Sequence, residues 1–146
     1  MPENSITIRT LGPEDVAILG RVQAGVFDHP IRPDQAAAFF ANDLNVMVAA
    51  ESGGRIVGMC SGHVMRHPDK APAFFVNEIS VHSGFRRRGI GTRLMQAILD
   101  AARRRGCEGI WLGTEKGNEA ARGLYRSMGA RETPGLVLYD WDDAEL

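Results

Sequence analysis

The sequence predicts an α/β fold built on one mixed sheet, and two patterns in the chain indicate it. Apolar runs at residues 46–51 and 55–64 flank Ser52-Gly53-Gly54, which is a strong hairpin signal. Further along, an alternating strand that ends near Val81 leads into a glycine turn, a long helical pattern and another apolar run at 109–113. A helix that connects two neighbouring strands implies at least one parallel pair.

The remaining elements are expected in simple order along the chain. Ile6 and Ile8 alternate with polar residues as in a first strand, and Pro13 with two acids opens a helix. A second short helix is expected over residues 33–42, and the fourth strand over 73–82. The long helix should run from Gly89 to near Gly106, the next helix should begin at Asn118 and stop at Gly129, and residues 136–141 read as a last strand.

Composition limits the classes of protein to consider. The 146 residues are 44% hydrophobic and 24% charged, which fits one globular domain over residues 1–146. The net charge of -1 gives no general attraction to nucleic acid, and no apolar run is long enough to span a bilayer. Without a signal-like N-terminus, the sequence predicts a cytoplasmic protein. Cys60 and Cys107 have no metal-ligand spacing and are expected to be buried thiols, so no metal site is predicted.

The strongest chemical signal is the stretch Arg86-Arg87-Arg88-Gly89-Ile90-Gly91-Thr92 at the start of the long helix. Its glycines allow a ligand to approach the backbone, and the first helical turn offers unpaired N–H groups. Together with three guanidiniums, these groups favour an anion such as a pyrophosphate. A dinucleotide-binding motif would require glycine or alanine at position 94, where this chain has Leu94. A phosphate-binding NTPase loop would end in Gly-Lys-Ser/Thr, which is absent from this stretch, so neither motif matches. We call residues 86–92 the phosphate cradle.

Arg86-x-x-Gly89-x-Gly91 also resembles the acyl-CoA pyrophosphate loop of the GCN5-related N-acetyltransferase (GNAT) family, and the resemblance covers nearly the whole chain. It implies acetyl-CoA as cosubstrate, and a sheet of six or seven strands with four helices, splayed between the fourth and fifth strands. It also implies that backbone groups of Ile79 and Val81 hold the thioester and pantetheine. Members of the family are commonly dimers, so a homodimer is expected.

Glu78 is the first candidate for the general base. It stands in Phe75-Val76-Asn77-Glu78-Ile79-Ser80-Val81, an otherwise apolar strand that leads into the phosphate cradle. A carboxylate there can accept the proton of an ammonium group and attract a cationic acceptor. An ion-paired strand carboxylate is the alternative interpretation, and His63, His67 and His82 are other possible bases.

Asn118 and Tyr125 lie two helical turns apart on roughly one face, as in the family pattern Asn-x-x-Ala-x-x-Leu-Tyr-x-x-x-Gly. By resemblance the asparagine contacts the pantetheine arm, and the tyrosine contacts the cofactor and protonates the departing thiolate. A helix cap explains Asn118 equally well, and a core aromatic is the alternative for Tyr125.

The acceptor-side residues most resemble small aminoglycoside 3-N-acetyltransferases and their environmental relatives, through residues 8–16, 67–70 and 75–81. Such a resemblance implies a small-molecule amine, an aminoglycoside, as substrate. The expected acceptor contacts are Asp28, His67, Glu78, Asp140 and Asp142. Two alternatives stay open: an acetyltransferase for another amine, such as a polyamine, an amino acid or a protein N-terminus, and a non-catalytic acyl-CoA sensor.

Overall fold

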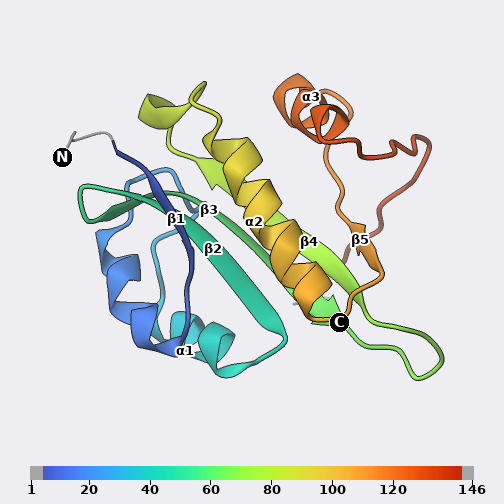
Figure 1. Ribbon diagram of the computed structural model, residues 1–146, viewed down its shortest axis with the longest axis horizontal. Helices are drawn as coiled ribbons and strands as arrows, with labels where there is room; N and C mark the ends of the chain where they lie inside the picture. Colours follow the sequence, from blue (N-terminus) through green and yellow to red (C-terminus); the bar gives the residue numbers. More distant parts are fainter. Residues whose placement is uncertain (1–4, 143–146) are drawn as a thin grey trace. The chain divides into compact units, whose positions relative to one another are not determined.

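Within residues 5–142, which this computed structural model describes, five strands form one sheet in the order β1-β2-β3-β4-β5 (Figure 1). The strands are β1 (Thr7–Thr10), β2 (Asn45–Ser52), β3 (Arg55–Met65), β4 (Ala73–Val81) and β5 (Gly109–Trp111). Strands β1 to β4 pair antiparallel, and β4 pairs parallel with β5. The predicted α/β class with a mixed sheet is therefore confirmed.

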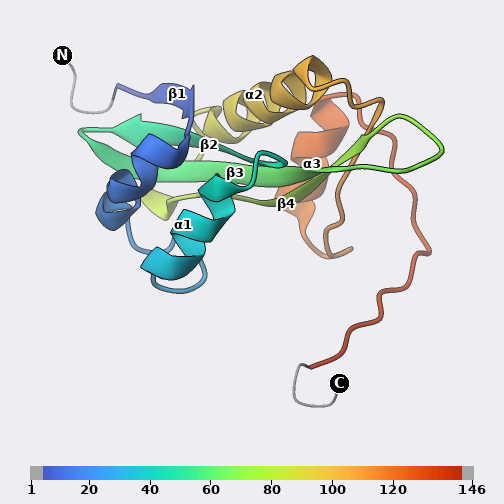
Figure 2. The same cartoon turned by 90° about the horizontal axis from the view of Figure 1, so that it is seen from below.

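Helices cover both faces of this sheet. The 3₁₀ helix η1 (Pro13–Arg21) and α1 (Pro33–Ala41) lie on one face, and α2 (Ile90–Arg104) lies on the other (Figure 2). A short 3₁₀ turn, η2 (Ser83–Phe85), separates β4 from α2, and α3 (Glu119–Ser127) follows β5. The sequence predicted a helix after Gly12, and the structure forms it with 3₁₀ geometry.

The chain falls into two compact units, one ending at Gly113 and the other beginning at Thr114. The first holds the sheet with η1, α1, η2 and α2, and the second holds α3. No helix within residues 5–142 is long and apolar enough to cross a membrane.

The β2–β3 hairpin forms because its two turn residues are glycines. Gly53 and Gly54 have φ of 58° and 77°, and Ser52 pairs with Arg55. Two successive positive φ angles define the turn type whose twist matches that of the flanking strands, and glycine adopts them without steric cost. The hairpin prediction is confirmed.

Alternating side chains of the central strands supply the core on both faces of the sheet. Met47, Ala49, Ile56 and Met59 pack with residues of η1 and α1, including Leu19. On the other face, Cys60 Sγ lies 4.0 Å from Met95 Sδ of α2. Burial, together with a smaller effect of the Glu78 charge, raises the pKa of the Cys60 thiol to about 12, so the thiol stays protonated. Both cysteines are free and buried, as the sequence predicted.

The strand predicted at residues 136–141 is wrong. These residues form no regular secondary structure, and their large apolar side chains are exposed, from 71% for Trp141 to 84% for Leu138. A strand requires a neighbouring edge to take its backbone hydrogen bonds, and among residues 5–142 no strand pairs with this segment. The count of five strands falls short of the six or seven expected for this reason.

Candidate functional site

A pocket of about 400 Å³ opens between η1, α1 and the sheet. One wall is apolar and comes from both helices, the segment between them and strand β2. Its residues are Leu19, Phe27, Ile31, Phe39, Phe40 and Met47. Polar residues from the sheet form the floor, namely Ser61 of β3 and Asn77 and Glu78 of β4, while Asp28 and Arg32 stand in the segment between η1 and α1.

A β-bulge places Glu78 in this pocket. The pairing of β3 with β4 joins Gly62 to Val76 and Ser61 to Glu78, so Asn77 is the extra residue on β4. Residues directly opposite one another in an antiparallel pair share a face of the sheet. In an unbroken register, Glu78 would oppose Cys60, whose sulfur points to α2, whereas the bulge sets it opposite Ser61, which lines the pocket. Asn77 and Glu78 therefore both line the pocket although they are adjacent in sequence.

The surroundings of Glu78 favour its neutral form. The side chain keeps accessible surface, yet desolvation by the neighbouring protein raises its pKa, and the negative charge of Asp28 raises it further. A carboxyl group with a raised pKa is a better proton acceptor, because its conjugate acid is weaker. The pocket thus holds two carboxyl groups whose charges act on each other.

The backbone of the phosphate cradle is left-handed at two positions. Arg87 and Gly89 have φ of 65° and 74°, both left-handed, and Gly89 is the N-cap of α2. Left-handed residues beside a helix start turn successive N–H groups toward one concave side, which suits an anion. A left-handed arginine is uncommon and costs about 1–2 kcal/mol, so the surrounding structure must hold it in place.

The arginines of the cradle are exposed, and two of them are positioned by their neighbours. Arg86 Nε donates to the carbonyl oxygen of Val81 at 3.1 Å, and the Arg88 guanidinium lies 5.0 Å from the Phe85 ring centroid. His82 caps the intervening turn, since its Nδ1 accepts from the Gly84 N–H at 3.0 Å. Of the alternative bases, His82 therefore has a local structural role.

At Ile79 and Val81, strand β4 is not paired with β5. The β4–β5 pairing ends at Phe75 and Trp111, while β4 continues to Val81. On its other edge, Ile79 and Val81 pair with Cys60 and Gly58 of β3. This is the separation expected of a splayed pair of strands, and it lies directly before the cradle.

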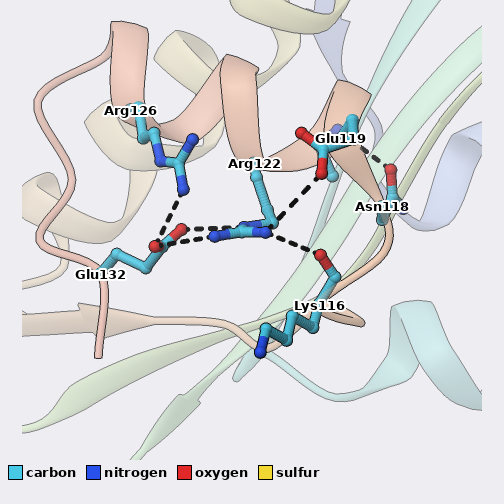
Figure 3. Close-up of polar contacts among 7 residues, drawn as sticks. Lys116, Asn118, Glu119, Arg122, Arg126 and Glu132 are labelled. Carbon is cyan, nitrogen blue, oxygen red and sulfur yellow. Dashed lines mark hydrogen bonds and ion pairs between the residues drawn. The ribbon is translucent and has the colours of Figure 1, made fainter. Parts of the chain in front are cut away.

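The second unit contains α3 and a cluster of ion pairs that fixes the chain after it (Figure 3). Arg122 donates to both carboxylate oxygens of Glu132 at 3.1 Å, and Arg126 donates to the same carboxylate at 3.0 Å. These hydrogen bonds lower the pKa of Glu132 to about 2. Asn118 caps α3 through its side-chain oxygen, which accepts from the Ala121 N–H at 3.0 Å. Tyr125 is half-buried on the same helix.

The predicted acceptor residues are thus divided between the two units. Asp28 and Glu78 line one pocket. His67 lies in the loop between β3 and β4 and is not among the residues that line it. Asp140 and Asp142 are exposed residues of the second unit, beyond α3.

Sequence reasoning missed several residues of the pocket. Asn77, Ser61, Phe27 and Arg32 all line it. The position of Asn77 depends on the bulge, for which the sequence carries no local signal. Phe27 and Arg32 lie in an irregular segment without periodicity, so only the strand pattern around Ser61 offered a clue.

The pocket therefore lies beside a bulged strand that leads into an arginine- and glycine-rich helix start. The chain belongs to the GNAT family: residues 18–130 match the model of the Acetyltransferase (GNAT) family. Enzymes of this family use acetyl-CoA.

One of two curated relatives supports the assignment. The chain is 33% identical over 126 residues to the N-alpha-acetyltransferase RimI of Mycobacterium tuberculosis, covering 85% of this chain and 77% of that protein. It is 36% identical over 127 residues to an uncharacterized protein of Mycobacterium leprae, but spans only 34% of that protein's length.

Solved structures share the fold. An aminoglycoside acetyltransferase from an uncultured soil metagenomic sample has a TM-score of 0.79 at 22% identity, covering 94% of this chain and 98% of that one. The aminoglycoside acetyltransferase AAC(6')-Iy, solved with a bisubstrate analogue, also has a TM-score of 0.79, at 17% identity and covering 94% of this chain and 99% of that one. At these identities the likeness concerns the fold alone.

Proposed function

We propose that this protein acetylates a primary amine held in the pocket, with Glu78 as general base. The observation that carries the proposal is the β-bulge, which turns Glu78 into the pocket on the strand that leads into the phosphate cradle. Its raised pKa suits it to accept the proton that an ammonium group must lose before its nitrogen can attack.

The cradle fits the pyrophosphate of coenzyme A. A Cβ at Gly89 would meet no heavy atom within 4 Å, so the space beside the backbone is open, and the arginines at 86–88 are exposed. Backbone N–H groups at the start of α2 and these guanidiniums would hold the phosphates. Acetyl-CoA supplies the acetyl group as an activated thioester, and the thiol leaves as the amide bond forms.

The roles of the remaining residues are part of the same proposal. Backbone groups of Ile79 and Val81, on the stretch of β4 that β5 does not pair, would receive the thioester and the pantetheine arm. Tyr125, carried from the family pattern, would donate a proton to the departing sulfur. Asn118 caps α3 and would also contact the pantetheine arm.

The test measures thiol release from acetyl-CoA by purified protein with a panel of amines. Glu78→Gln should lower turnover by roughly 10²-fold, the usual range for a general base, while leaving acetyl-CoA binding nearly unchanged. Glu108→Gln, at an exposed carboxylate just before β5, is the matched control and should retain full activity. Wild-type turnover in Glu78→Gln would remove Glu78 from the mechanism.

The comparisons offer two candidates for the identity of the amine. An aminoglycoside is supported by the fold shared with aminoglycoside acetyltransferases, although the 6' designation of one of them gives no support to 3-N regiochemistry. A protein N-terminus is supported by the 33% identity to an N-alpha-acetyltransferase. Parallel assays with an aminoglycoside and a short peptide separate the two.

We also propose that the chain works as one acetyltransferase domain. The family match over residues 18–130 continues across the boundary between the two units, which supports this proposal. Homodimer formation stays a prediction, and light scattering on the purified protein can test it.

A further inference from the structure

We infer that the pocket selects a small primary amine that carries a single positive charge and an apolar group, such as an arylalkylamine, over a polycationic aminosugar. This inference rests on the proposed function and narrows its acceptor. It is carried by the chemistry of the residues that line the pocket between η1, α1 and the sheet.

The lining offers mainly apolar surface to whatever enters. Aromatic side chains of Phe27, Phe39 and Phe40 and the aliphatic side chains of Leu19, Ile31 and Met47 line it. A hydroxyl-rich sugar ring placed against these groups would lose hydrogen bonds to water without replacement. An aromatic or branched aliphatic group there would instead be stabilised by its removal from water.

The charges of the lining suit one ammonium group. The Asp and Glu residues of the lining are Asp28 and Glu78, and Arg32 opposes them with one positive charge. Arg32 donates to Asp34 at 3.1 Å, and both side chains are well exposed, so its own charge is partly balanced at the rim. The carboxyl groups of the lining therefore supply at most two negative charges, which suits an amine with one ammonium group better than an amine with several.

The two carboxyl groups also define where that ammonium binds. The Asp28 charge raises the pKa of Glu78, so the two groups are close enough to repel each other. An ammonium between them would relieve the repulsion and place its proton within reach of Glu78. Asp28 would then anchor the cation while Glu78 accepts the proton, and the apolar group of the amine would face the phenylalanines.

The volume of the pocket admits such an amine. About 400 Å³ lies near the lower end of the range of about 300–1,000 Å³ for ligand pockets. A phenyl ring with a short aminoalkyl chain fits within this space.

The experiment compares three probe amines on the full chain. Phenylethylamine has one ammonium and an apolar body, glucosamine has one ammonium and a hydroxylated body, and tobramycin carries several ammonium groups. Calorimetric titration in the presence of coenzyme A measures acceptor binding without transfer, and thiol release from acetyl-CoA measures turnover. We expect phenylethylamine to bind at least roughly 10-fold tighter than glucosamine, on the scale expected for burying a few methylene-sized apolar groups.

Substitutions in the pocket test which residues determine the preference for phenylethylamine. Asp28→Asn should weaken phenylethylamine binding by roughly 10-fold through loss of a charge-assisted contact. Asp100→Asn, on the exposed face of α2 across the sheet, is the control and should bind as the wild type does. Phe27→Ser should reduce the preference for phenylethylamine over glucosamine, and melting curves of each variant report whether it folds.

The outcomes separate the inference from the proposed function. Tighter binding of tobramycin or glucosamine, or no binding of phenylethylamine, overturns the inference, even if acetyl transfer to another amine upholds the enzyme. Selective binding of phenylethylamine that depends on Asp28, but without thiol release from any amine, supports the pocket's preference and refutes catalysis.

Discussion

Replacing Gly62 with alanine would insert a methyl group into space that the neighbouring strand already fills. A Cβ built at Gly62 would overlap Phe74 Cε2 and would lie 2.5 Å from the carbonyl oxygen of Phe75. Both contacts are shorter than those that real Cβ atoms show. Phe74 is fully buried and the second atom belongs to the backbone, so neither can move aside at low cost.

The expected loss follows from these contacts. Overpacking a close-packed core costs about 1–3 kcal/mol, and a backbone clash places Gly62→Ala at the upper end, about 3 kcal/mol. Alanine also lowers the conformational entropy of the unfolded chain, which offsets about 0.4–1 kcal/mol of this loss of stability. The net loss is about 2–2.5 kcal/mol, which for a chain of this length lowers the melting temperature by about 4–10 °C.

Thermal melting followed by circular dichroism measures this loss. Gly20→Ala is the matched control, because a Cβ at Gly20 meets no heavy atom within 4 Å; its stability should change by less than about 1 kcal/mol. Because Gly62 pairs with Val76 beside the bulge, we also expect Gly62→Ala to lose turnover through displacement of Glu78. A melting temperature within about 1 °C of the wild type would refute the packing argument.

Four further predictions test other parts of the molecule. Arg88→Ala should raise the Michaelis constant for acetyl-CoA about 10-fold with little change in turnover at saturation. The control Arg104→Ala, at the exposed C-terminal end of α2, should leave this Michaelis constant unchanged. Equal Michaelis constants in the two variants would argue against the cradle. The rate of acetyl transfer should fall as acid protonates Glu78. The midpoint of this fall should lie above the usual glutamate pKa, because desolvation and the Asp28 charge raise the pKa of Glu78. A midpoint at or below the usual value in the pH profile would contradict the prediction. The Asp15 carboxylate accepts a hydrogen bond from the backbone N–H of Gly12, which lowers its pKa. Asp15→Asn should therefore lower the free energy of unfolding in urea by about 1 kcal/mol at neutral pH. The difference in stability between wild type and variant should shrink as the pH falls below the usual aspartate pKa. The Glu132 carboxyl should titrate near 2 by NMR, and a midpoint near 4.5 would show that its arginine contacts do not persist in solution.

Much of the fold follows from short-range patterns in the chain. Gly53 and Gly54 specify the hairpin because few other residues adopt two successive positive φ angles. Glycines at 89 and 106 bracket the long helix, and both have left-handed φ in the structure. The phosphate cradle was found in the sequence for the same reason, since all its groups come from one continuous segment.

The predicted strand at residues 136–141 shows where this reasoning fails. Leu136, Val137 and Leu138 have strong strand propensity, but propensity alone forms no strand. The segment needs a partner to take its backbone hydrogen bonds, and the sequence does not reveal whether such an edge is available. Its apolar side chains are exposed in the structure as a result.

By itself, the sequence determined the family, and it predicted the cradle and Glu78 from residue type and local spacing. Asp28 was one of several predicted acceptor contacts, and the sequence did not show that Asp28 shares a pocket with Glu78. Only the tertiary structure decided that Glu78 faces the pocket. In an unbroken β4 it would point toward α2, and the bulge at Asn77 exists only in the pairing of β4 with β3. The apolar wall around Phe27 likewise depends on how the segment between η1 and α1 folds over the sheet. Strand register and chain packing are set by contacts between distant residues, and local sequence patterns do not specify them.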